Sequence, residues 1–140
     1  MKKLLLISLL TFSSMAFADS QAILNTALKS YQESGSKAFI STLLKNSPLA
    51  NEKSMLASLE SAFPTFETFY GKPKSVEVLR EVNVSQKVNN VFFVLNYETG
   101  PVYGMLTRFD GPKGDVTTYI IVDAKQTNVF SNNMVYGKEK

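Results

Sequence analysis

The chain contains no histidine, no cysteine and no tryptophan, and the first two absences exclude whole classes of chemistry. Without histidine there is no Ser-His-Asp or Cys-His nucleophile, no ordinary zinc site and no histidine-ligated haem. Without cysteine there is no disulfide, so packing alone must hold the fold. No GxGxxG or GxxxxGK[ST] string occurs either, so no nucleotide cofactor is indicated. We expect no cofactor, no metal and no catalytic residue that can be assigned from the sequence.

The first eighteen residues have the pattern of a secretory signal peptide. Lys2 and Lys3 precede an apolar run, which ends in Ala16-Phe17-Ala18. Small residues one and three positions before a bond are what signal peptidase requires, so cleavage is predicted between Ala18 and Asp19. The alternative is a membrane anchor, but the run is shorter than the ~20 residues that a bilayer requires. The sequence therefore predicts a periplasmic or secreted protein whose single domain, 19–140, does not span the membrane.

The charge of this predicted domain is nearly balanced. Removal of residues 1–18 takes away two lysines and lowers the formal net charge from +3 to +1. The remaining basic residues are scattered among acidic ones, whereas a protein that binds phosphate backbones needs a cationic face. We therefore expect no nucleic-acid partner.

The spacing of the apolar residues divides the chain into a helical half and a strand half, with the change near Gly71. Helical spacing predicts a first helix over 19–35, a second from Ser36 and a third from Pro48. Pro64 predicts a kink or break in the third helix, because proline lacks the amide hydrogen that the helix uses. Gly71 is typical of a helix end.

Beyond Gly71 the apolar residues alternate, which is typical of strands. The first strand is predicted to carry Val76, Val78, Val82 and Val84 on one face together with Arg80. Three more strands, joined by tight turns, are predicted over residues 91–98, 102–109 and 116–123. The first of these three has two apolar faces, which indicates a central strand, and Gly104 in the next predicts a bulge or bend.

The predicted fold class is therefore α+β, with amino-terminal helices packed on a curved antiparallel sheet of about four strands. The tail, which contains Val129-Phe130 and then Met134, Val135 and Tyr136, is expected to add a short edge strand or to cover the mouth of a cavity.

Two segments carry a resemblance to known proteins: the run from Phe69 to Val76 after the last helix, and the run from Phe92 to Gly100. With the three helices before them, these segments resemble small exported bacterial domains of the nuclear-transport-factor-2-like and cystatin-like superfamily. The resemblance implies a cone-shaped fold whose sheet wraps around the helices and encloses a pocket. Some members use that pocket for catalysis, and others use it to bind a ligand or a protein.

Four residues are candidates for ligand binding. Arg80, on a face of valines, needs a carboxylate, for which Glu67 and Glu98 are possible partners, or else carbonyl groups or a bound anion. Tyr97, Tyr103 and Tyr119 fall on three successive strands and could line a concave pocket; the alternative for them is ordinary cross-strand packing. Arg108 resembles Arg80 in its position on a strand face, but its closeness to the turn at Asp110 favours exposure.

The acidic residues Asp110, Asp115 and Asp123 lack the ligand pattern of a calcium loop, so they are interpreted as turn residues. The function that these observations favour is a non-catalytic binding module for a small molecule or an envelope protein, with a homodimer as a possible assembly. The alternatives are a histidine-free isomerase or hydrolase of the same fold and an inhibitor or accessory subunit in the envelope.

Overall fold

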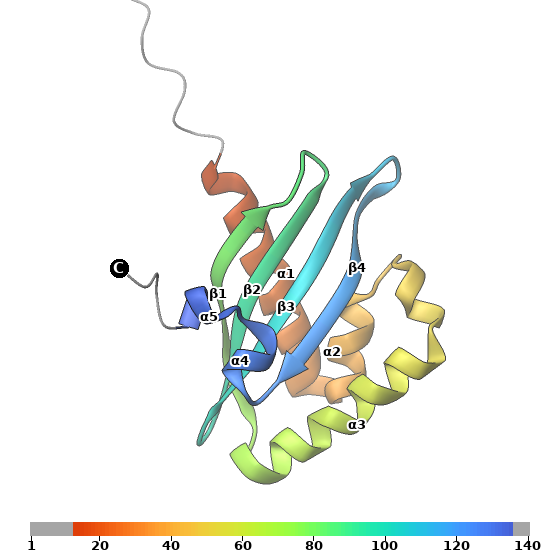
Figure 1. The fold of residues 1–140 in the computed structure, drawn as a ribbon. Helices are drawn as coiled ribbons and strands as arrows, with labels where there is room; N and C mark the ends of the chain where they lie inside the picture. Colours follow the sequence, from red (N-terminus) through yellow and green to blue (C-terminus); the bar gives the residue numbers. More distant parts are fainter. Residues whose placement is uncertain (1–12, 136–140) are drawn as a thin grey trace, which may run out of the picture.

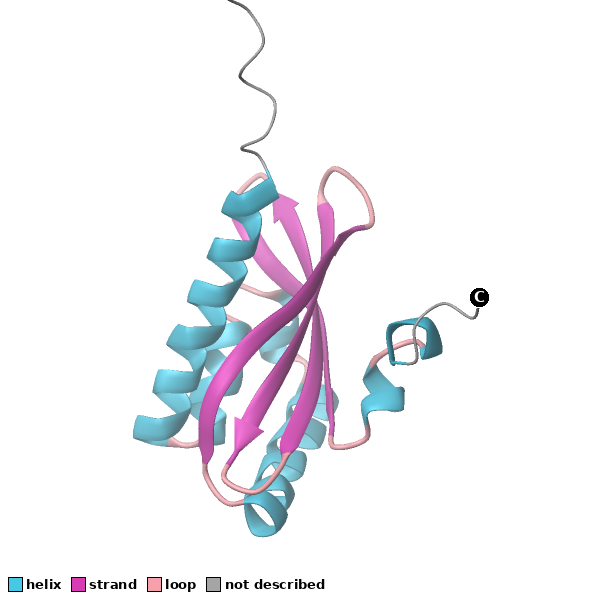
Figure 2. Cartoon of the chain, turned by 90° about the vertical axis from the view of Figure 1, so that its left-hand side faces the viewer, coloured by secondary structure: helices cyan, strands magenta, loops and turns pink. Residues whose placement is uncertain are grey.

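The computed structural model describes the backbone of residues 13–135 and the side chains of residues 19–134, so the predicted signal peptide lies outside the described residues over 1–12, as does Tyr136. It confirms the α+β class. Helices α1 (Ser13–Ser34), α2 (Ser36–Leu43) and α3 (Lys53–Tyr70) pack against an antiparallel sheet of β1 (Pro73–Asn83), β2 (Val88–Tyr97), β3 (Pro101–Gly111) and β4 (Gly114–Asp123), as Figure 1 shows. The side view in Figure 2 shows these helices on one side of a strongly twisted sheet.

The hydrophobic core lies between the helices and the sheet. The predicted stripe of the first helix is buried there through Leu24, Ala27, Leu28 and Tyr31. Aromatic rings fill the centre and contact one another, mostly edge to face: Tyr31, Phe39, Phe63, Phe66 and Tyr97. Full burial of one large apolar side chain stabilises a fold by roughly 1.5–3 kcal/mol, so this cluster fixes where α1 and α3 sit.

The helix boundaries differ from the prediction at three places. The first helix begins at Ser13, before the predicted start at Asp19. Pro48 begins a 3-10 turn, η1 (Pro48–Asn51), in which the Ser47 hydroxyl accepts the Leu49 N–H at 3.0 Å, and α3 follows only from Lys53. Of the kink or break predicted at Pro64, the break is wrong, because α3 continues through the proline, and the kink stays a prediction. Buried Phe63 and Phe66 on either side of the proline anchor both halves of the helix to the core.

The predicted face of the first strand is also wrong beyond Val78. A bulge lies between Val78 and Arg80, so that Val78 is opposite Phe93 whereas Arg80 is opposite Phe92. Adjacent residues of β2 point to opposite faces of the sheet. Arg80 is therefore exposed on the face away from the helices, and no pattern of alternate residues could reveal the extra residue that moves it there.

Side chains of α1 cover the free edge of β1, which is an outer strand of the sheet. The Gln21 amide donates to the Val76 carbonyl at 2.9 Å and accepts the Val78 N–H at 2.8 Å. Gln32 donates to the Pro73 carbonyl at 3.1 Å, near the other end of the same helix. These bonds satisfy main-chain groups that an edge strand otherwise presents to solvent.

The tail forms two short helices, α4 (Gln126–Val129) and α5 (Asn132–Val135), so the predicted edge strand is wrong. Phe130 is buried against Phe92 and Tyr103, with ring centroids 5.7 and 5.4 Å apart, on the face of the sheet opposite α1. β2 is central, as predicted, with β1 and β3 beside it. Within the described part of the chain, no helix is both long and apolar enough to cross a membrane.

Candidate functional site

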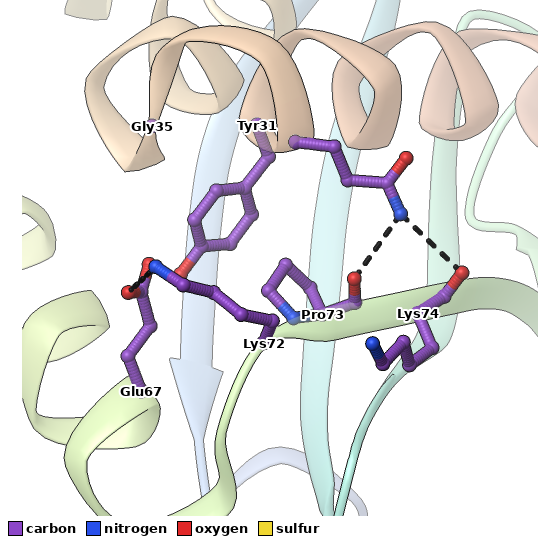
Figure 3. A pocket seen from close by; sticks show the side chains of 7 residues that line it. Tyr31, Gly35, Glu67, Lys72, Pro73 and Lys74 are labelled. Atoms are coloured by element: carbon purple, nitrogen blue, oxygen red, sulfur yellow. Dashed lines mark hydrogen bonds and ion pairs between the residues drawn. The ribbon is translucent and has the colours of Figure 1, made fainter.

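A pocket of about 460 Å³ opens where α1 ends and where α3 connects to β1. Its lining comes from both helices, from the connecting residues Gly35 and Lys72, and from the first two residues of β1: Tyr31, Gln32, Gly35, Glu67, Lys72, Pro73 and Lys74. Figure 3 shows the Tyr31 ring extending from α1 toward the Glu67 carboxylate, while Lys72 reaches across from the loop before β1. The pocket thus combines an aromatic wall with charged groups at its rim.

The connection between α3 and β1 positions this rim. Gly71 ends α3 with φ +80°, a left-handed conformation that glycine adopts without strain. A Cβ at this position would also collide with the Glu98 carboxylate in the turn between β2 and β3. The Glu98 N–H donates to the Lys72 carbonyl at 3.1 Å and the Thr99 N–H donates to the Tyr70 carbonyl at 3.0 Å. The two segments on which the resemblance rests therefore meet here, and together they hold Lys72 and Lys74 in place.

Tyr31, which lines the pocket, contacts a second tyrosine, Tyr97, which lies behind it and does not line the pocket. The Tyr31 and Tyr97 hydroxyls lie 3.2 Å apart and share a hydrogen bond. Burial raises the pKa of Tyr31, and its bond to Tyr97 and the nearby Glu67 carboxylate raise it further. Burial also raises the pKa of Tyr97 to about 12, although the bond from Tyr31 acts in the opposite direction. Both hydroxyls therefore stay protonated at neutral pH.

Two ion pairs stand at the mouth of the pocket. Lys72 Nζ lies 2.7 Å from Glu67 Oε2, and Lys74 Nζ lies 2.7 Å from Glu98 Oε1. The hydrogen bond to Glu67 raises the pKa of Lys72, and the bond from Lys74 lowers the pKa of Glu98. Both shifts favour the charged forms of Lys72 and Glu98, and each lysine side chain has further N–H donors to offer.

The pKa shifts at this pocket favour binding over proton transfer. A general acid or base works best when its pKa lies near the operating pH. Here the pKa values of Tyr31, Tyr97 and Lys72 rise from values already above neutrality, and that of Glu98 falls from a value already below it. None of these four pKa values moves toward neutrality.

The structure does not bring the four predicted ligand-binding residues together. Tyr97 is buried on the helix side of the sheet, next to the pocket. Tyr103 packs against Phe130 on the opposite face. Arg80 and Tyr119 are exposed on that opposite face too, and Tyr119 has a relative exposure of 48%. A ligand-binding role for these four stays a prediction, and only Tyr97 adjoins the pocket.

The sequence interpretation missed the residues that line the pocket. Tyr31 fitted the core stripe of a helix equally well, and Glu67 was interpreted only as a partner for Arg80. The one local signal was the Gly-Lys-Pro-Lys run after a helix, since a glycine followed by a proline fixes a sharp exit and places two lysines beside it.

A second polar site surrounds Arg108, whose predicted exposure is wrong. Its side chain is only 10% exposed on the helix side of β3. The guanidinium lies 2.6 Å from Asp115 Oδ2 and 3.3 Å from Asp19 Oδ2. Burial raises the pKa of Asp115, Arg108 lowers it, and the carboxylates of Asp19 and Asp110 raise it again. Within the described residues, no group of three or more acidic side chains is arranged to hold a metal ion.

No family model matches the chain, and neither a curated protein nor a solved structure matches it.

Proposed function

We propose that this chain is an exported, non-catalytic binding module that takes a small molecule in the pocket at the junction of α1, α3 and β1. The observation that carries the proposal is the pocket itself, in which an aromatic wall lies beside two lysines held at fixed positions. Its volume of about 460 Å³ falls in the range of ligand sites, roughly 300–1,000 Å³. The pKa shifts away from neutrality support binding without proton transfer.

The ligand that this lining favours is a small carboxylate with an apolar body. Lys72 and Lys74 supply ammonium donors, and charge-assisted hydrogen bonds to a carboxylate are stronger than neutral ones. The Tyr31 ring supplies an apolar wall, and its protonated hydroxyl is held by Tyr97. Glu67 and Glu98 hold the two lysines in place, and they also exclude ligands that carry several negative charges.

The test is titration calorimetry of the purified protein with carboxylates of increasing apolar size: acetate, hexanoate, benzoate and phenylacetate. We expect affinity to rise with the apolar body, because the aromatic wall then becomes covered. Lys72→Gln should weaken binding about tenfold, which is the loss expected when one charged contact disappears. Lys29→Gln is the matched control, because Lys29 is also exposed and paired with a glutamate, Glu33, but lies outside the pocket. Equal affinities for the two variants would contradict the proposal.

The export part of the proposal rests on the amino-terminal sequence, in which Lys2 and Lys3 precede an apolar run that ends in Ala16-Phe17-Ala18. Among the described side chains, the first that belongs to the hydrophobic core is that of Leu24. A cut between Ala18 and Asp19 would therefore leave every core residue named above within the product. Mass spectrometry of the protein recovered from a bacterial periplasm measures the cut, and an intact Met1 in that fraction would argue against it.

The second candidate function is the binding of a protein, either a second copy of the chain or an envelope protein. The face of the sheet away from α1 favours this function, because it carries exposed apolar side chains. Tyr119 is 48% exposed on this face, and Leu79, at the bulge between Val78 and Arg80, is 47% exposed. Light scattering measures the mass in solution, and a dimer that Tyr119→Lys converts to a monomer would place the contact on this face. A monomer for both proteins would contradict self-association.

A further inference from the structure

We propose that the polar cluster around Arg108 receives the α-ammonium group that cleavage before Asp19 would create, so that processing completes the fold. The inference rests on the export part of the proposed function and is independent of the pocket. It starts from an imbalance of charge. Arg108 contacts the carboxylates of Asp19 and Asp115, and Asp110 stands directly opposite Asp115 in the pairing of β3 with β4. Arg108 thus pairs with two carboxylates, and a third, that of Asp110, lies near one of them.

Two unpartnered acceptors extend the same cluster toward β1. Asn89 is directly opposite Arg108 in the pairing of β2 with β3, and its amide donates to Glu81 Oε2 at 3.0 Å. Among the residues that the structure describes, Glu81 Oε1 and Asn89 Oδ1 are shielded from solvent and have no hydrogen-bond partner. A buried acceptor without a donor is costly, so the cluster lacks N–H donors as well as positive charge.

The α-ammonium of Asp19 would supply what is missing. Cleavage adds one positive charge and three N–H donors at a residue whose side chain already contacts Arg108. The amino-terminal part of α1 lies at the end of the sheet where the β1–β2 and β3–β4 turns are (Figure 1). The strand residues of the cluster lie close to these two turns in the sequence. The groups that would face the amine are Asp19 on α1, Glu81 on β1, Asn89 on β2, Arg108 and Asp110 on β3, and Asp115 on β4.

The sign of one pKa decides the question. The amino terminus of a helix carries a partial positive charge, which lowers the pKa of an ammonium group placed there. Nearby carboxylates raise it. An ordinary α-amino group has a pKa of about 7.7–8.0, so a helix alone predicts a value below this range and the cluster predicts a value above it.

The experiment expresses the full-length chain in a bacterial host and isolates the processed protein from the periplasm. Mass spectrometry identifies the first residue, and the rate of amine acylation is then measured against pH on the amino-terminal peptide. We expect Asp19 as the first residue and a midpoint about one pH unit above the ordinary value, which corresponds to roughly tenfold slower acylation at pH 7. Asp115→Asn and Glu81→Gln should each lower the midpoint, whereas Glu33→Gln, at the far end of α1, should not.

The other outcomes separate the inference about the amine from the export proposal. A protein that starts at Asp19 but whose amine titrates at or below the ordinary value overturns this inference and leaves export standing. A protein cut at a different bond overturns it as well. A chain that keeps Met1 in every cell fraction overturns the export proposal together with the inference. If Asp115→Asn does not fold, Glu81→Gln alone carries the comparison with Glu33→Gln.

Discussion

Gly104→Ala should destabilise the fold through a single buried ring. Gly104 lies opposite Phe93 in the pairing of β2 with β3, on the face that meets the helices. An added Cβ would lie 2.6 Å from Phe93 Cε1 and closer still to Cζ, whereas ordinary contacts are about 3.4–4 Å. Phe93 has a relative exposure of 0% and is enclosed by the core, so it cannot move aside. Overpacking of this kind costs about 1–3 kcal/mol of unfolding free energy.

The assay is chemical denaturation of four proteins that form a double-mutant cycle. Phe93→Leu removes Cε1, Cε2 and Cζ, the three ring atoms that the new methyl group would meet. In that background Gly104→Ala should cost less than half of what it costs in the original protein, so the two changes are strongly non-additive. Additive costs would refute the reasoning, because they would mean that the ring does not lie over Gly104.

Three further changes test other contacts. Gln21→Ala should cost about 1–3 kcal/mol of unfolding free energy, because it leaves the Val76 carbonyl and the Val78 N–H at the strand edge without their side-chain partner. Thermal melting measures the loss of stability, and a loss as small as that of Lys29→Ala would count against the edge contact. Arg108→Met should cost about 1–3 kcal/mol of unfolding free energy, measured in urea. This is below the roughly 3–5 kcal/mol lost when a fully buried ion pair is broken, because Asp19 and Asp115 are partly exposed. An unchanged urea midpoint would contradict the buried pairing. Tyr31 and Tyr97 have raised pKa values in the folded protein, so their contribution to stability is complete below pH 10 and is lost as the pH rises through the folded values, about 12 for Tyr97. Absorbance at 295 nm should show a late ionisation step that Tyr97→Phe reduces. Full ionisation of all tyrosines near pH 10 without unfolding would contradict the burial of these two.

The sequence predicted the elements well where burial sets the spacing of the apolar residues. The stripe of α1 follows from its burial against the core, the two apolar faces of β2 follow from its central place in the sheet, and both are confirmed. The prediction failed for the faces on which the two strand arginines lie. The bulge after Val78 moves Arg80 to the other face, and Arg108, whose exposure was expected, is the arginine that is buried.

The pocket could not be predicted for a related reason. Tyr31, Glu67 and Lys72 come from two helices and a loop that are far apart in the sequence, and only tertiary packing brings them together. Each residue by itself fits an ordinary structural role. The charge pattern offered no help, because Lys72 and Lys74 are each balanced by a glutamate.

The most direct test of the central claim is to map bound phenylacetate by the amide chemical shifts of the isotope-labelled protein. The account predicts saturable shifts that are concentrated at Gln32, Gly35, Lys72 and Lys74, the lining around Tyr31. Saturable shifts on the opposite face of the sheet, around Tyr103 and Tyr119, or no saturable shifts with any carboxylate of the series, would contradict it.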